Sequence, residues 1–332
     1  MDVRDVLPPD AIPSVDEPSF GTEYFGDADD QVIVVEASPP RAYPIRILHF
    51  HEIVNDELQT GADGSEAGAE PIAVTWCPLC GSAIVYDRRV EGRTLTFGVS
   101  GKLADDDLVM YDRETGSEWK QSLGECFAGE LAGTRLTVRP ASMVTWKTFR
   151  DEHPDGVVLQ PLAVDSEVAS DDDEPAPVDY DLEPYERYFE RDGFGLAAHR
   201  VGESERRWDR DDLDPKTVVL GVECQGTALG FPLPRVREHG GVVQTTVGAT
   251  DVVVFEVDGE LHAYEAPGFA FQREGSGFVG DGTRWDGATG RAADGRQLDR
   301  LPTRRLFAFT WQDDHGPGAF YDSMAGDEQH KR

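Results

Sequence analysis

The sequence of 332 residues lacks long apolar runs. No stretch reaches the roughly 18 consecutive apolar residues that a membrane-spanning helix needs. The N-terminus has neither the basic start nor the apolar core of a secretory signal peptide. We therefore expect no membrane span and a cytoplasmic protein. Three catalytic signatures are also missing: the phosphate-binding G-x-x-x-x-G-K-[ST], the nucleophile elbow G-x-S-x-G and the metalloprotease helix H-E-x-x-H.

Basic residues are scarce. The chain has 31 lysines and arginines against 64 aspartates and glutamates, which gives a formal net charge of -33. The acidic excess is spread along the chain, and most of the basic residues are arginine. Such diffuse acidity is typical of proteins that work in molar salt, where screening weakens the self-repulsion. We predict a halophilic source and exclude nucleic acid and anionic membranes as partners.

Cysteine is also rare, with four residues at Cys77, Cys80, Cys126 and Cys224. Four cysteines in a chain of this length do not form a disulfide scaffold, which agrees with a reducing cytoplasm. Cys126 and Cys224 stand alone and are expected to be packing residues. Cys77 and Cys80 differ from them, because they form a C-x-x-C pair within "WCPLCG".

The rest of the sequence consists mostly of short runs with strand preference, bounded by turn residues. It predicts a mainly β fold with a few short helices (α+β), in packed sheets or partly closed barrels. An acidic, proline-containing stretch interrupts the pattern and indicates a linker or long surface loop. The predicted parts are an N-terminal extension over 1–30, a first unit over 31–160, the acidic linker over 161–185, a second unit over 186–325 and a tail over 326–332.

Several short sequence segments of the first unit have similar counterparts in the second unit. The segment around Pro44 resembles the segment around Pro232, "MYDRETGS" returns as "RWDGATGR", and "VTWKTFRDEHPDG" returns as "FTWQDDHGPG". We read these as two degenerate copies of one β-rich unit. The alternative is that β proteins reuse the same turn chemistry. The second copy has no cysteine turn, which favours a functional over a purely structural role for the pair.

The pair Cys77 and Cys80 admits four interpretations. A thioredoxin-type pair opens a helix, but the "AIVY" that follows prefers a strand. A zinc knuckle on a hairpin fits better, yet a closed site needs four ligands, which His49, His51, Cys126 or a second chain would have to complete. The pair could also act as a nucleophile, with Cys77 as the thiolate and His51 as the base. The fourth interpretation is two small buried hydrophobes.

The first unit carries a series of longer motifs. They are "PRAYPIRILHFHEIVND", "CPLCGSAIVYDR", "TFGVSG", "DLVMYDRETGSEW", "GELAGTRL" and "TWKTFRDEHPDG", from about Arg41 to Gly156. In content and order they resemble the DUF3179 family of uncharacterised proteins of bacteria and haloarchaea. The resemblance implies no activity, because none is established for the family. It implies these site positions: His51, Glu52, Asn55, Asp56, Cys77, Cys80, Gly81, Ser100, Gly101, Tyr111, Asp112 and Trp119.

These observations lead to one functional hypothesis. We expect a thiol-based redox or metal-binding protein with Cys77, Cys80 and His51 as catalytic residues. Cys77, Cys80, His51 and His49 would also be the ligands of one transition metal ion, namely zinc, iron or copper. A small-molecule ligand would contact the following residues: Glu52, Asn55, Asp56, Ser100, Tyr111, Asp112 and Trp119.

Two alternatives stay open. One is a non-catalytic ligand-binding or scaffold module whose cysteines are structural. The other is a hydrolase or transferase with Cys77 as the nucleophile. The acidic run Asp105, Asp106 and Asp107 is expected to be a solvated loop, because its spacing lacks the alternation of a calcium-binding loop. The sequence makes no prediction of the oligomeric state.

Overall fold

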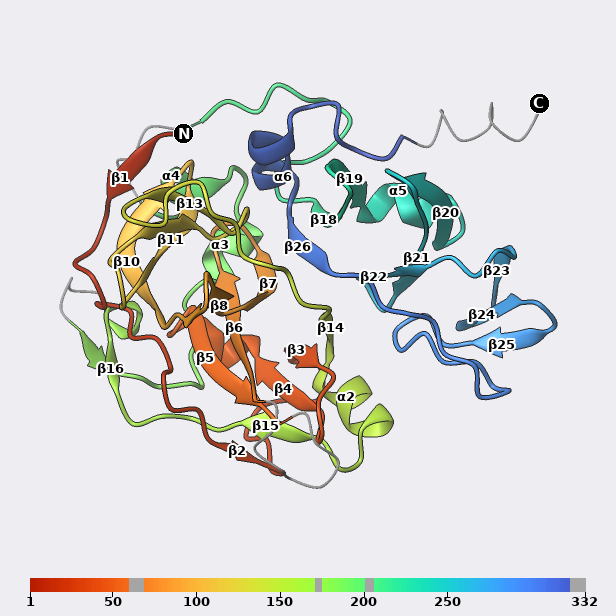
Figure 1. Cartoon of the computed structure of the whole chain (residues 1–332), viewed down its shortest axis with the longest axis horizontal. Coiled ribbons are helices and arrows are strands. Elements are labelled where there is room, and N and C mark those ends of the chain that lie inside the picture. Colours follow the sequence, from red (N-terminus) through yellow and green to blue (C-terminus); the bar gives the residue numbers. More distant parts are fainter. Residues whose placement is uncertain (60–68, 171–174, 201–205, 323–332) are drawn as a thin grey trace. The chain divides into compact units, whose positions relative to one another are not determined.

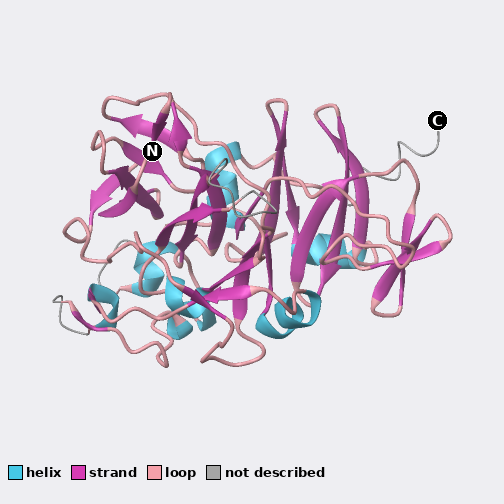
Figure 2. Ribbon diagram, turned by 60° about the horizontal axis from the view of Figure 1, so that its bottom comes forward, coloured by secondary structure: helices cyan, strands magenta, loops and turns pink. Residues whose placement is uncertain are grey.

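The structure is a computed structural model that describes residues 1–59, 69–170, 175–200 and 206–322. Strands account for 42% and helices for 12%, which confirms the predicted mainly β fold with short helices (Figures 1 and 2). The chain divides into two compact units, Met1–Asp209 and Arg210–Arg332. The tail predicted over 326–332 lies outside the described residues.

The first unit contains two five-stranded sheets. One has the order β1–β10–β11–β12–β13 and is antiparallel throughout. Its strands are β1 (Val3–Asp5), β10 (Phe97–Ala104), β11 (Asp107–Asp112), β12 (Glu118–Lys120) and β13 (Glu125–Ala128). The other has the order β14–β3–β4–β15–β2, with β4 and β15 parallel. Its strands are β14 (Ser142–Thr145), β3 (Gln31–Val35), β4 (Arg41–Pro44), β15 (Val157–Leu159) and β2 (Phe20–Gly21).

A three-stranded antiparallel meander carries the cysteine turn. It consists of β5 (Ile53–Leu58), β6 (Glu70–Cys77) and β7 (Ser82–Asp87). Ile72, Val74 and Val85 from this meander lie in one hydrophobic core with Tyr43 and Phe50. Because both faces of β6 are covered, it reads as a continuous apolar run rather than an alternating one.

The remaining elements of the first unit are short. Helix α1 (Ile45–Leu48) follows β4, and α2 (Trp146–Glu152) follows β14, with the Thr145 side chain accepting a hydrogen bond from the Thr148 backbone N–H at its start. The others are β8 (Arg89–Val90), β9 (Arg93–Thr94), β16 (Asp165–Ser166), β17 (Ala176–Pro177), the 3-10 helix η1 (Glu167–Ala169), α3 (Glu186–Glu190) and α4 (Gly195–His199).

The segments predicted as an extension and a linker take part in this first unit. Strand β1 pairs with β10, and the Val15 N–H donates to the Ile53 carbonyl at 2.8 Å. Past residue 160, Tyr180 packs in the core of the meander, and the Tyr188 hydroxyl donates to the Leu79 carbonyl at 2.5 Å. These buried aromatic side chains are the physical reason why the compact unit extends to Asp209, beyond the predicted linker over 161–185.

The second unit, coloured from teal to blue in Figure 1, has three antiparallel groups of strands. The first is β19–β18–β26, from β18 (Val218–Cys224), β19 (Thr227–Pro232) and β26 (Thr303–Phe307). The second is β20 (Val242–Val247), β21 (Thr250–Val257) and β22 (Glu260–Glu265). The third is β23 (Phe271–Glu274), β24 (Gly277–Gly280) and β25 (Thr283–Trp285). Helix α5 (Leu233–Glu238) follows β19, and α6 (Ala308–His315) follows β26.

Candidate functional site

The cysteine turn closes the β6–β7 hairpin. Cys77 pairs with Ser82 at the end of the ladder, so the turn itself consists of residues 78–81. Gly81 has a φ of 53°, a left-handed conformation that glycine adopts without a steric penalty. Its N–H donates to the Pro78 carbonyl at 3.3 Å. The turn places the two thiols on one side, and both are buried, with Cys77 2% and Cys80 0% exposed.

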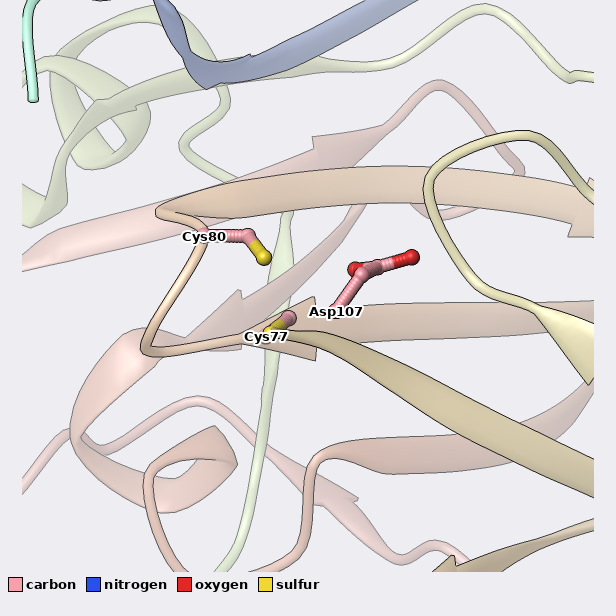
Figure 3. A group of neighbouring side chains, drawn as sticks. All are labelled: Cys77, Cys80 and Asp107. Atoms are coloured by element: carbon pink, nitrogen blue, oxygen red, sulfur yellow. The ribbon is translucent and has the colours of Figure 1, made fainter. Parts of the chain in front are cut away.

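A carboxylate from another strand completes a cluster with these thiols. The ligand atoms of Cys77, Cys80 and Asp107 all lie within 4.8 Å of one another (Figure 3). Asp107 begins β11 and is fully buried, and its Oδ2 accepts a hydrogen bond from the Ser122 N–H at 2.8 Å. Two sulfur atoms and one oxygen atom therefore converge in the interior of the first unit.

Asp107 was not among the site residues predicted from the sequence. The run of three acids was expected to be a solvated loop, but Asp105 and Asp106 form the two-residue turn between β10 and β11, both with positive φ. Asp107 is thus the first residue of a buried strand. The apolar "LVM" that follows it was the available signal, because it indicates that the strand enters the core.

The environment of the thiols disfavours their ionised forms. Burial raises the pKa of Cys77, and the nearby carboxylates of Asp107 and Glu52 raise it further. A hydrogen bond with Cys80 acts in the opposite direction. The Cys80 thiol also donates to the Asp106 carbonyl at 3.3 Å. A thiol with a raised pKa is a poor nucleophile at neutral pH, unless a cation or a metal ion lowers the pKa again.

Cys77 also lines a cavity of about 1090 Å³ in the first unit. Apolar side chains form much of its wall, including Ile12, Phe50, Leu79, Val99, Leu103 and Leu108. The polar residues of the wall include Glu52, Glu167, Tyr185, His199 and Arg200, of which Glu52 and Tyr185 interact electrostatically with Cys77. A cavity whose wall combines apolar side chains with convergent polar groups suits a small-molecule ligand.

Glu52 is the predicted ligand-binding residue that lines this cavity. It follows α1 and is only 8% exposed. Burial raises its pKa to about 8, and the carboxylates of Glu167 and Asp107 add to that effect. Among the described residues, no hydrogen bond or ion pair is made by its carboxyl group. At pH 7 this carboxyl is therefore mostly neutral when no ligand is bound, and a cation beside it would favour its ionised form.

Tyr185 and the pair Glu167–Arg200 border the same end of the cavity. Burial raises the pKa of the Tyr185 phenol well above its usual range, with Glu52 and Cys77 contributing. Glu167 is bound by Arg200 at 3.1 Å, so this cation is already paired. The His199 ring stacks on the Tyr185 ring at 5.1 Å, and burial lowers the His199 pKa. Sequence reasoning missed these four residues, because they lie in or beyond the segment expected to be a linker.

The structure places the two predicted histidines elsewhere. The Nδ1 of His51 lies 2.8 Å from the Pro13 carbonyl, and its Nε2 lies 2.7 Å from the Tyr180 hydroxyl. Both ring nitrogens thus have partners, and burial lowers the His51 pKa. The Nδ1 of His49 lies 3.5 Å from the Glu183 carboxylate. The cluster of Cys77, Cys80 and Asp107 includes neither ring.

Asn55 and Asp56, which were predicted to bind a ligand, join elements of the first unit. The Asn55 amide donates to the Phe97 carbonyl at 2.8 Å and accepts from the Phe97 N–H at 2.9 Å, which ties β5 to β10. Asp56 accepts hydrogen bonds from Arg41 and from the Tyr43 hydroxyl, both at 2.5 Å. Through these hydrogen bonds both residues stabilise the first unit. Their contact with a ligand stays a prediction.

The other four predicted residues also have partners within the first unit. Ser100 donates to the Val109 carbonyl at 2.6 Å beside the irregular pairing near Gly101, and the Tyr111 hydroxyl donates to Asp10 at 2.6 Å. Asp112 accepts hydrogen bonds from Thr115 and from the Trp119 indole, the latter at 3.0 Å. Ligand contact by these residues likewise stays a prediction.

Within the described residues, every helix is too short or too polar to cross a membrane, in agreement with the expected absence of a span. The cytoplasmic location, the halophilic source and the exclusion of nucleic acid stay predictions from composition.

The comparison with known proteins gives a family but no activity. Residues 9–318 match the family described as a protein of unknown function (DUF3179), which is nearly the whole chain. No curated protein matches the chain, and no solved structure does. The resemblance inferred from the motifs is confirmed, and the chain belongs to the DUF3179 family.

Proposed function

We propose that Cys77, Cys80 and Asp107 bind one transition metal ion. The observation that carries the proposal is the convergence of their ligand atoms within 4.8 Å of one another in the protein interior. Two thiolates and one carboxylate form a ligand set suited to zinc or iron. A metal ion would also offset the cost of burying these groups, because it lowers the pKa of its thiol ligands.

Three protein ligands leave one position of a tetrahedral ion open. Sites of this kind are typical of catalytic rather than structural zinc, in which a water molecule or a substrate takes the fourth position. Cys77 lines the cavity, so a molecule in the cavity could approach the cluster. When bound, the ion would supply Lewis-acid chemistry. The chain would contribute the Ser122 N–H, which orients the Asp107 carboxylate.

A thiol redox role is the second candidate. Cys77 and Cys80 are hydrogen-bonded to each other, so their sulfur atoms are close enough to form a disulfide after a small movement. The pair sits on a β-turn instead of at a helix N-terminus, and the Cys77 pKa is raised. Both features argue against an attacking thiolate. Metal binding is therefore the stronger candidate.

The test is elemental analysis and thiol counting on the full chain, purified without chelator or affinity-column metal. We expect about one zinc or iron ion per chain and two thiols protected from alkylation. Cys77→Ser should abolish metal binding, and Asp107→Asn should weaken it at least about tenfold. Cys126→Ser is the matched control, because Cys126 is an equally buried thiol outside the cluster.

The outcomes separate the two candidates. A chain without metal whose stability does not change on adding zinc contradicts metal binding. If that chain also forms one reversible disulfide between Cys77 and Cys80, the redox role stands instead. Two inert thiols in both oxidised and reduced buffer would make the cysteines packing residues and would contradict both candidates.

A further inference from the structure

The cavity beside the cysteine turn has polar groups that the proposed metal site does not use. Glu52 is 8% and Tyr185 6% exposed, and both line the cavity. Among the described residues, no hydrogen bond is made by the Glu52 carboxyl or by the Tyr185 hydroxyl. Buried polar groups in folded proteins nearly always have a partner. Two such groups facing one cavity therefore indicate a ligand that supplies the missing partner.

The backbone at Glu52 adds a second, independent observation. Glu52 has a φ of 58°, a left-handed conformation that is costly for a residue with a side chain. Its N–H donates to the Leu48 carbonyl at 2.8 Å, and its carbonyl accepts from the Trp76 N–H at 2.7 Å. The fold thus fixes this backbone firmly, and a glycine would satisfy it at lower cost.

The second unit has that glycine. Gly241 follows α5 as Glu52 follows α1, with a φ of 78°. Its N–H donates to the Val236 carbonyl at 2.9 Å, and its carbonyl accepts from the Glu256 N–H at 2.8 Å. The two positions share a positive φ and a carbonyl bonded to the middle strand of the following meander, although the N–H bond spans four residues at Glu52 and five at Gly241. The second unit makes this connection without a carboxyl group. The acid at position 52 contributes something other than the fold, since it adds strain and a buried ionisable group.

The charges around Glu52 favour a cation. Glu167 and Asp107 both raise the pKa of Glu52, and no cation appears among the causes of its shift. Of the three cations of the cavity wall, Arg200 is bound to Glu167 at 3.1 Å, Lys102 is bound to Glu118 at 2.6 Å, and Arg187 is exposed to solvent. A ligand with a positive charge would complete this group of acids.

The apolar side chains of the cavity wall and the cavity volume indicate the chemistry and size of the rest of the ligand. Leu79, Leu103 and Leu108 are among its apolar side chains, and the volume of about 1090 Å³ suits a molecule of ordinary metabolite size. We propose that this cavity binds an amphipathic organic cation, with an ammonium group against Glu52 and Tyr185 and an apolar body against the leucines. Glu52 would hold the cation whether or not the neighbouring thiols hold a metal ion.

The test compares three compounds with the same six-carbon body: hexylammonium, 1-hexanol and hexanoate. Their binding to the full chain is measured by calorimetry in about 1 M KCl, which screens the exposed acids but not a buried contact. We expect hexylammonium to bind at least about tenfold more tightly than 1-hexanol, and hexanoate to bind most weakly. Equal binding of hexylammonium and 1-hexanol, or no binding of any of the three, would overturn the proposal.

Variants assign the preference to Glu52. Glu52→Gln should reduce the affinity for hexylammonium about tenfold, to the level of 1-hexanol. Glu52→Gly should do the same while keeping the fold, because glycine adopts the positive φ of this position without a steric penalty. Glu190→Gln is the matched control, since Glu190 is an exposed acid of α3 outside the cavity wall. If Glu52→Gln still binds hexylammonium more tightly than 1-hexanol, the proposal fails. The metal content of the same variants tests the proposed metal site separately.

Discussion

The meander of the first unit and the meander of the second close their second hairpin with different turn residues. In the first, β6 and β7 are joined by the turn over 78–81, which holds Cys80 and follows Cys77. In the second, β21 and β22 are joined by Asp258 and Gly259, a two-residue turn with φ of 51° and 89°. An Asp-Gly turn is the common way to close such a hairpin. The fold therefore does not require the two thiols.

The same contrast holds across the two units. Both contain a hairpin, a short helix that begins after a proline, and a three-stranded meander in the same order. In both, a later strand pairs with the first strand of the hairpin and leads into a helix. We infer from this order that the units arose by duplication. The cysteine turn and Glu52 mark what the first unit has in addition, which is why we assign function to it.

The largest predicted effect is a difference between the wild type and Glu52→Gln in how stability depends on pH. The Glu52 pKa rises from 4.5 to about 8 on folding, so the folded state binds more protons between these values. Relative to Glu52→Gln, the wild type should lose stability as the pH rises from 4.5 to about 8 and lose no more above that. Each pKa unit corresponds to about 1.4 kcal/mol, which gives about 5 kcal/mol at most.

Denaturant unfolding of both proteins across this pH range measures the effect. Parallel curves for wild type and Glu52→Gln would show that the carboxyl does not titrate in the folded chain as its buried position predicts. Gly241 offers no titrating group at the corresponding place, so the effect belongs to the first unit.

Replacing the aspartate of each Asp–Thr turn should give the second-largest difference in stability between the two units. Asp112 and Asp286 each accept hydrogen bonds from the N–H and hydroxyl of a threonine three residues later, but Asp112 is fully buried and also binds the Trp119 indole. Asp112→Ala should cost about 3 kcal/mol, because a buried indole N–H loses its partner. Asp286→Ala, in an exposed turn, should cost about 1 kcal/mol. Equal costs in thermal or urea unfolding would show that burial does not distinguish the two turns.

The smallest predicted effect on stability comes from exchanging Glu52, after α1, and Gly241, after α5. The two substitutions should change the stability in opposite directions. At a pH below 4.5, where the Glu52 carboxyl is neutral in both the folded and the unfolded state, Glu52→Gly should stabilise the chain by about 1 kcal/mol, because it removes strain at a positive φ. Gly241→Glu should destabilise it by about 1 kcal/mol, since a Cβ there meets the Arg273 guanidinium at 2.2 Å and the φ is unfavourable. Differential unfolding measurements on both variants check the signs. A destabilising Glu52→Gly would mean that the carboxyl supports the fold after all.

Local chemistry made part of this structure predictable. The preference of "AIVY" for a strand argued against a helix after Cys80, and those residues lie in β7. The glycine of "CPLCG" has the positive φ that a tight turn needs, and the glycine of "DRETG" has it too. The mainly β class and the family followed from such segments, because turn residues and strand propensity act over a few positions of sequence.

The sequence by itself determined the strands, the turns and the position of the two thiols. Only the tertiary structure decided what surrounds them. Asp107 reaches the thiols because a turn with two positive φ values directs it into the core, and His51 is held by Tyr180 from 129 residues away. Tyr185 reaches the cavity from the segment over 161–185 that reads as a polar linker, and Arg200 reaches it from the residues beyond that segment. Such contacts depend on packing between distant segments, and no short window of sequence encodes them.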